Sequence, residues 1–178
     1  MGQPDPARLA DMPVLDPFPL RTVVLLLATI TMGLSAGLFA TFSYAVMPGL
    51  RPTDDRTFVA AMQSINVKIL NVWFAICFVG PIILTALAIP LHLGPAGRPQ
   101  LPWLVIALVL YLVTLVITFR ISVPLNNALA AADDPDQIDD LASVRRRFEA
   151  PWVRWNVVRS ISTTVAFAVL AVALLASP

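Results

Sequence analysis

The sequence predicts an all-α integral membrane protein, a four-helix bundle whose second and fourth helices carry amphipathic extensions on one membrane face. Hydrophobic residues make up 58% of the 178-residue chain and charged residues 13%, and the mean hydropathy is +0.80. This composition is too apolar for an ordinary soluble domain. Lys, Arg, Asp and Glu are absent from four segments: residues 22–48, 69–91, 99–119 and 160–178. A helix crosses a bilayer with roughly 20 apolar residues, which the fourth segment reaches by including the turn before it.

We expect one membrane domain, residues 19–178, preceded by a tail. Its antiparallel spans should lie at about residues 20–47, 69–91, 102–121 and 155–177. Residues 1–18 hold four prolines and three aspartates, a composition that favours a mobile tail over a cleaved signal peptide.

The first span carries Gly33 and Gly37 four residues apart. This spacing of small residues lets another helix backbone approach closely. We expect both glycines at a helix crossing within the bundle, and the alternative is a contact between two copies of the chain. Pro48 and Pro52 predict the end of the span.

The second helix is predicted to start at Thr53, whose hydroxyl caps free amides next to the acids Asp54 and Asp55. Neither Gly nor Pro follows until Gly80. An amphipathic helix is therefore expected to run without a break into the second span.

The connection after the second span is rich in Gly and Pro, and its single histidine, His92, is expected to be solvated. The only cysteine, Cys77, is distant in sequence. One histidine and one cysteine so placed offer no ligand set for a metal.

The third helix should bend at the membrane edge, because Pro124 frees the carbonyl of Arg120. A further helix is predicted from Pro135 to about Phe148, with Asp134 as its N-cap.

Two features mark the approach to the fourth span. Arg145, Arg146 and Arg147 are expected to form a solvated or headgroup-facing surface. Pro151 should then break or bend the entry into the span.

Antiparallel spans bring most of the polar side chains to one membrane face. At 100° per residue, Trp152, Asn156 and Arg159 fall on one stripe with Trp155 beside it. Polar groups at membrane depth are costly unless paired, so the cluster either bonds the helices together or lines a ligand cavity. The candidate site residues at this face are Tyr44, Asn66, Arg120, Asn126, Asn127, Trp152, Trp155, Asn156 and Arg159.

The basic residues indicate orientation rather than nucleic-acid binding. The formal net charge is +1 and the basic residues are scattered at segment ends, which excludes a phosphate-tracking surface. Nine Lys or Arg lie on the side of the first and third loops and three on the other. This bias predicts a multi-pass protein of the cell membrane with the polar face in the cytoplasm.

Four motifs carry a resemblance to a known family. They are GLFATFSYAVMP at 37–48, AMQSIN at 61–66, VPLNN at 123–127 and WVRWNVVR at 152–159. Together they resemble a large family of four-span membrane proteins that includes the anthrone oxygenases of polyketide pathways, over roughly residues 25–175. The resemblance implies oxidation of an activated, fused-ring carbon acid by O2 to a quinone, without flavin or haem.

The resemblance also implies roles for the candidate residues. Arg120 or Arg159 would pair with the developing oxyanion, with Asn127 and Asn156 as further donors. The substrate-binding residues would be Tyr44, Asn66, Asn126 and the stacking rings of Trp152 and Trp155. The base is left open between Tyr44, Glu149 and the substrate's own acidity.

Two functions remain open from the sequence. One is an oxygenase that takes a lipophilic aromatic molecule from the lipid bilayer. The other is a non-enzymatic binding or scaffold subunit whose polar cluster holds the helices together and whose Gly33/Gly37 face forms a homo-oligomer. A cavity of about 300 Å³ or more at the polar face would favour the first, and amides bonded to one another would favour the second.

Overall fold

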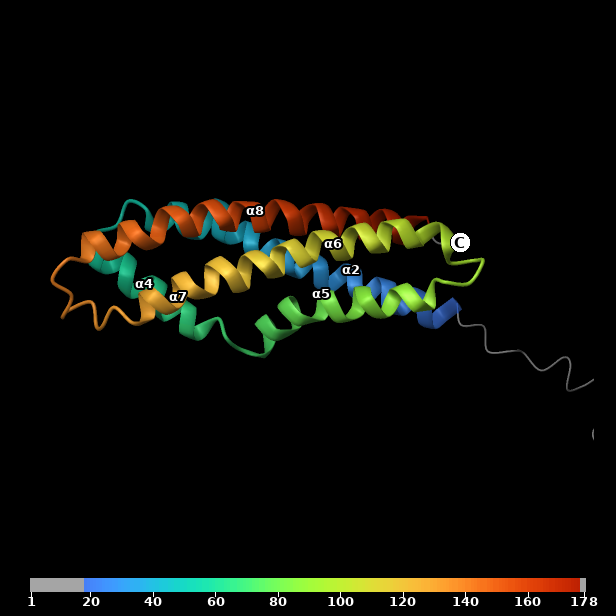
Figure 1. Ribbon diagram of the computed structural model, residues 1–178, viewed down its shortest axis with the longest axis horizontal. Coiled ribbons are helices and arrows are strands. Elements are labelled where there is room, and N and C mark those ends of the chain that lie inside the picture. The colour runs from blue at the N-terminus through green and yellow to red at the C-terminus, as the bar shows by residue number, and fades with distance from the viewer. Residues whose placement is uncertain (1–17, 177–178) are drawn as a thin grey trace, which may run out of the picture.

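The computed structural model describes residues 18–176, which are helical and contain no strand within that range. Figure 1 shows a long bundle in which one helix, α8, runs the whole length. The α-helices are α2 (Phe18–Thr41), α3 (Met47–Leu50), α4 (Asp55–Lys68), α5 (Val72–Leu91), α6 (Leu101–Ile117), α7 (Val123–Ala130) and α8 (Leu141–Leu175). Shorter helical turns are Phe42–Val46, Arg98–Gln100 and Thr118–Ser122.

Four helical stretches in the described part are long and apolar enough to cross a membrane. They are Leu20–Leu50, Val72–Leu91, Arg98–Ala130 and Leu141–Leu175. The predicted all-α, four-span fold is thus confirmed, and the chain is a multi-pass membrane protein. The predicted tail lies outside the described residues except for Phe18, where α2 begins. The single-domain boundary at residue 19 stays a prediction.

The bundle has two packed regions. Helix α2 packs on α5 and α8, and α6 packs on α8 and more lightly on α5. One core, which includes Leu25, Met32, Tyr111 and Leu170, fills the span region. A second core forms where α4, α7 and the first half of α8 meet at one end of the bundle (Figure 1).

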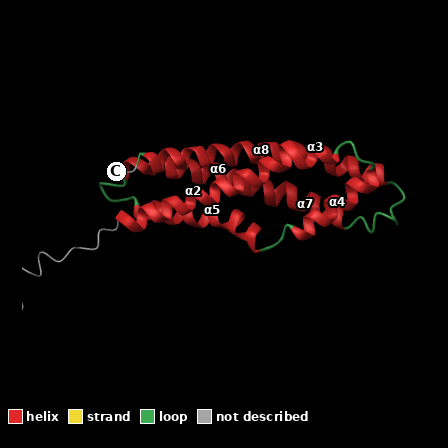
Figure 2. Cartoon of the chain, turned by 180° about the vertical axis from the view of Figure 1, so that it is seen from behind, coloured by secondary structure: helices red, strands yellow, loops and turns green. Residues whose placement is uncertain are grey.

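The predicted unbroken second helix is wrong, because the chain leaves the helix between Lys68 and Val72. The Asn71 side chain accepts hydrogen bonds from the backbone amides of Trp73 and Phe74 and caps α5. Asparagine competes with the helical backbone in this way. The amphipathic helix α4 is therefore a separate element, joined to α5 by a loop that Figure 2 shows in green.

Two predicted helix starts also change. Asp54, not Thr53, caps α4 by accepting from the Thr57 amide. The fourth long helix begins at Leu141 rather than Pro135, with Asp140 as its cap. Asp134 caps only a turn, by accepting from the Asp136 amide.

Prolines end the predicted helices less often than expected. Pro151 lies inside the continuous 35-residue α8. Pro48 and Pro124 each follow a π-helical turn, Phe42–Val46 and Thr118–Ser122. In an α-helix a proline ring clashes with the carbonyl four residues earlier. Here that carbonyl lies within the wider π-helical turn, which relieves the clash. The chain therefore continues as helix to Leu50 after Pro48 and to Ala130 after Pro124.

The predicted close crossing holds for Gly33 but not for Gly37. A Cβ at Gly33 would lie 2.9 Å from the ring of Phe167 on α8, whereas a Cβ at Gly37 would meet nothing within 4 Å.

His92 also differs from expectation. It is buried, 2% exposed, with its Nδ1 donating to the Ala88 carbonyl at 2.7 Å.

Candidate functional site

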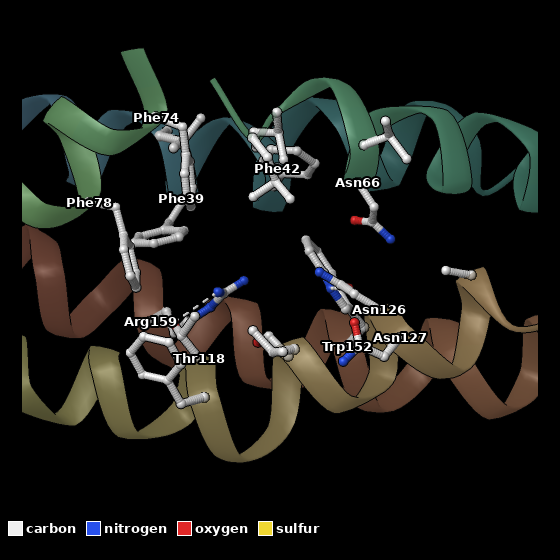
Figure 3. Close-up of a pocket in the computed structure, with 18 of the residues that line it drawn as sticks. Phe39, Phe42, Asn66, Phe74, Phe78, Thr118, Asn126, Asn127, Trp152 and Arg159 are labelled. Atoms are coloured by element: carbon white, nitrogen blue, oxygen red, sulfur yellow. Dashed lines mark hydrogen bonds between the residues drawn. The ribbon is translucent and has the colours of Figure 1, made fainter. Parts of the chain in front are cut away.

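A cavity lies between the two packed regions, enclosed by α2, α4, α5, α7 and α8 (Figure 3). Its volume is about 440 Å³, within the ~300–1,000 Å³ common for small-molecule sites. We call it the central cavity. Its aromatic lining consists of Phe39, Phe42, Phe74, Phe78, Phe119 and Trp152. Its polar lining consists of Gln63, Asn66, Thr118, Ser122, Asn126, Asn127 and Arg159.

The cavity reaches the outer surface through apolar side chains. Val67, Leu70 and Phe119 line it and are 66%, 71% and 60% exposed. In a membrane protein such a surface faces lipid or the interface rather than open water. A lipophilic molecule therefore meets an apolar entrance.

Arg159 projects into the cavity from α8 and is only 5% exposed. Its guanidinium donates to Thr118 Oγ1 at 3.2 Å and to Asn156 Oδ1 at 2.8 Å. It lies over the Phe39 ring at 4.5 Å and near the Trp152 ring at 5.6 Å. Within residues 18–176 no carboxylate forms an ion pair with it, and its Nε has no hydrogen-bond partner. The cavity wall thus contains a buried cation whose partners are all neutral.

Asn156 holds this cation in place. The amide is 1% exposed, and its Nδ2 donates to the Phe39 carbonyl at 3.0 Å and to Ser43 Oγ at 2.8 Å. Its Oδ1 is then fixed as the acceptor for Arg159. The side chain ties α8 to the first span and sets the direction of the guanidinium.

Trp152 and Asn126 form a second contact across the cavity wall. Trp152 precedes Arg159 by seven residues, and Asn126 follows Thr118 by eight. The Trp152 Nε1 donates to Asn126 Oδ1 at 2.9 Å. The Trp152 ring packs on Phe42 at 5.5 Å and on Phe148 at 6.0 Å between centroids. The indole is therefore held by two aromatic contacts and one hydrogen bond and forms part of the cavity wall.

The match to known families falls on the half of the chain that supplies most of this wall. Residues 71–169 match the model of the anthrone oxygenase family. The chain belongs to this family. No curated protein and no solved structure matches the chain. In this anthrone oxygenase relative the matched stretch contains Thr118, Asn126, Trp152, Asn156 and Arg159.

The structure brings together five of the nine candidate residues predicted for this anthrone oxygenase family member. Asn66, Asn126, Asn127, Trp152 and Arg159 line the central cavity. Asn156 stands directly behind Arg159 without lining it.

The other three candidates lie elsewhere. Tyr44 is 72% exposed and bonded to Thr41 at 3.3 Å. Trp155 is half-buried outside the lining, and Arg120 is exposed. The prediction that Arg120 shares a face with Asn127 assumed an unbroken α-helical period. The π-helical turn Thr118–Ser122 changes that register and presents Thr118 and Ser122 instead.

Sequence reasoning missed the phenylalanines and Thr118. Phe74 and Phe78 are four residues apart and stack at 5.2 Å, a spacing visible in the sequence. Thr118 gave no such signal, because its role depends on Arg159 of another helix.

Neither protein base considered for the reaction reaches the cavity. Tyr44 points outward, and Glu149 accepts from Arg145 Nε at 2.7 Å on another surface. The lining residues include no carboxylate and no histidine.

Proposed function

We propose that this protein oxidises a lipophilic, electron-rich carbon acid of the anthrone type with O2 in the central cavity. The observation that carries the proposal is Arg159, a buried cation without an anionic partner among the described residues, set in an aromatic cavity. An anionic, planar ligand supplies what this site lacks. Family membership supports the same chemistry.

The reaction converts a ring CH2 and O2 into a ring carbonyl and water. Loss of one proton gives an enolate whose charge resides on the ring oxygen. The enolate transfers an electron to O2, and the resulting radical and superoxide combine at carbon to give a peroxide. Loss of the second proton with cleavage of the O–O bond leaves one oxygen atom in the quinone and the other in water.

Arg159 acts on the first step. Its charge, placed beside the enolate oxygen, favours deprotonation because the opposite charges attract in a region of low dielectric. Asn156 keeps the guanidinium oriented, and Phe39 and Trp152 flank the ring plane. The cation is fixed before the substrate arrives, so little reorganisation is needed as charge develops.

The proton goes to solvent in this proposal, since neither a carboxylate nor a histidine lines the cavity. The rate should then depend on the concentration of hydroxide or of ionised substrate. We expect kcat to rise about tenfold per pH unit up to the pKa of the bound substrate. A bell-shaped profile with an acidic limb near neutrality would instead indicate a protein base.

The activity test uses protein purified in detergent or nanodiscs, an anthrone and measured O2. We expect equal molar consumption of O2 and formation of the quinone. The matched variants are Arg159→Met and Arg146→Met, which remove a cavity arginine and an exposed arginine from the same helix. Only Arg159→Met should lose activity; equal activity in both variants would contradict the proposal.

A second candidate, a non-enzymatic binding or scaffold subunit, is favoured by hydrogen bonds that join the spans. They include Asn156 to Ser43, Ser43 to Ser160 at 2.9 Å, and Trp152 to Asn126. In that case Asn156→Leu lowers stability by about 0.6–2 kcal/mol per lost bond, and no variant affects turnover.

Orientation and self-association remain proposals. We infer from the basic bias that the loop preceding α8 is cytoplasmic. Impermeant maleimide should label Ser143→Cys, in a Cys77→Ser background, only after permeabilisation of cells.

Gly37 is exposed and remains the proposed contact between two copies, so Gly37→Leu should abolish any dimer seen in detergent.

A further inference from the structure

We propose that Asn66 is a specificity-determining residue that donates a hydrogen bond to a second oxygen of the substrate, remote from the oxygen held by Arg159. The inference rests on the proposed function and adds to it the kind of substrate that the cavity accepts. That substrate carries acceptor oxygens at two separate positions of an aromatic skeleton.

The first observation is where the unsatisfied polar atoms lie. In the described part of the chain, five buried side-chain nitrogen or oxygen atoms have no hydrogen-bond partner. Three of them, Asn66 Nδ2, Ser122 Oγ and Arg159 Nε, belong to residues that line the central cavity. Such atoms cost free energy unless a partner is supplied. Their gathering around one cavity indicates that the partner is a ligand.

The second observation is the chemistry of these atoms. Asn66 Nδ2 and Arg159 Nε can only donate. The Asn126 Oδ1 already accepts from Trp152, so this side chain also presents its NH2 group as the remaining function. The serine hydroxyl rotates to suit its partner. The complementary ligand therefore offers acceptor oxygens to Asn66 and Arg159.

The third observation is the separation of the two polar groups. Figure 3 shows Arg159 beside Phe39 and Phe78 toward one end of the cavity, and Asn66 with Asn126 and Asn127 toward the other. The Arg159–Thr118 and Trp152–Asn126 contacts are seven residues apart on α8 and eight apart on the facing segment. This corresponds to roughly 10–12 Å between backbone levels. The side chains approach more closely than the backbone, since Arg159 Cζ lies 5.6 Å from the centroid of the Trp152 ring that donates to Asn126. A ligand that reaches both ends therefore carries oxygens at two different positions of a ring skeleton.

Charge distinguishes the two ends. Arg159 provides a full positive charge where the enolate forms, whereas the amide end is neutral. The oxygen near Asn66 is therefore one that stays neutral through the reaction, such as a carbonyl or ring hydroxyl oxygen.

The binding test uses quinone products, which need no turnover. Two ligands are compared: unsubstituted anthraquinone and an anthraquinone with an oxygen function on an outer ring. Quenching of tryptophan fluorescence gives Kd for each with wild type, Asn66→Leu and the control Ser64→Ala, an exposed α4 residue outside the central cavity.

Wild type and Ser64→Ala should prefer the oxygenated ligand, and Asn66→Leu should lose about ten- to hundredfold in affinity for it alone. Unchanged binding of the unsubstituted ligand shows that the cavity is intact. The same preference in wild type and Asn66→Leu would overturn the inference. If Asn66→Leu does not fold, the smaller change Asn66→Ala takes its place with the same expected loss, and an unaltered preference there overturns the inference.

Turnover separates this inference from the proposed function. Selective binding through Asn66 without oxidation of the corresponding anthrones would refute the oxygenase and leave the two-oxygen site standing. Oxidation that is equally fast for oxygenated and plain anthrones in wild type and Asn66→Leu would refute the Asn66 role and leave the oxygenase standing.

Discussion

Arg145 and Arg159 stand on the same helix, each over a phenylalanine ring, yet their surroundings are opposite. Arg145 lies 4.4 Å above Phe58 and Arg159 lies 4.5 Å above Phe39. Arg145 donates to two carboxylates, Glu149 at 2.7 Å and Asp55 at 3.1 Å, and to two backbone carbonyls. Arg159 donates to two neutral acceptors, and its Nε–H has no hydrogen-bond partner.

The difference separates a structural arginine from a chemical one. Arg145 fastens α8 to the α3–α4 loop and to the start of α4, and all its charge is compensated. Four of its five N–H groups are used in these hydrogen bonds. Arg159 keeps both charge and a donor in reserve, which is the requirement for binding an anion in a cavity.

The largest expected effect is the loss of activity when Arg159 is replaced. Arg159→Met should lower kcat/KM for anthrone oxidation by about 10²–10³-fold, the usual cost of losing one oxyanion donor. Stability should remain close to wild type, because an apolar side chain of similar volume often replaces a buried charge without loss. Steady-state kinetics and a melting curve measure both, and a folded variant with full activity would contradict the assignment.

The next largest effect is the loss of stability when Arg145 is replaced. Arg145→Met should lower the free energy of unfolding by roughly 1–3 kcal/mol, since four acceptors lose their donor but Asp55 is 41% exposed and partly solvated. Activity per folded molecule should not change. Denaturation in mixed micelles measures the loss. A reduced kcat at full folding would show that the two arginines are not functionally separate.

A third change tests the packing of α2 against α8 at Gly33 and Phe167. Gly33→Leu should destabilise by about 1–3 kcal/mol, because its side chain collides with Phe167. Gly37→Leu should leave the melting temperature of the monomer unchanged, because nothing lies within 4 Å. Equal destabilisation by both substitutions would mean that the first span packs with a different face inward.

The smallest effect concerns Asp54, which caps the helix that begins with Arg145's partner Asp55. Hydrogen bonds from the Thr57 hydroxyl and amide lower the pKa of Asp54 below its ordinary value of 3.8. The carboxylate therefore stabilises the fold above the unfolded-state pKa, and the contribution disappears as pH falls through the folded-state pKa. Asp54→Asn should be slightly less stable than wild type at pH 7, with the gap closing below about pH 4.

Composition and helical periodicity predicted much of this molecule. Charge-free segments were sufficient for the four spans, and the 100° period placed Trp152 and Arg159 on one stripe of α8. These predictions succeeded because burial in lipid imposes length, and because α8 is helical without interruption.

What the sequence did not predict depends on local competition and on distant partners. Asn71 caps the start of α5 and so interrupts a stretch whose other residues are compatible with a continuous helix. A π-helical turn, Thr118–Ser122, moves Arg120 out of the cavity. Arg145 was predicted to be solvated with Arg146 and Arg147, but only the latter two are exposed. Successive residues of a helix point 100° apart, and Arg145 is the one that faces both Asp55 and Glu149.

The most direct test of the central claim is a spectrophotometric pH titration of an anthrone bound to the protein under strictly anaerobic conditions. Without O2 the enolate accumulates, and its absorption reports the pKa of the carbon acid. The account predicts that binding to wild type moves this pKa well below that of free anthrone, and that Arg159→Met restores it. A bound anthrone that titrates like the free compound, or identically in wild type and Arg159→Met, would contradict the claim that Arg159 stabilises the enolate.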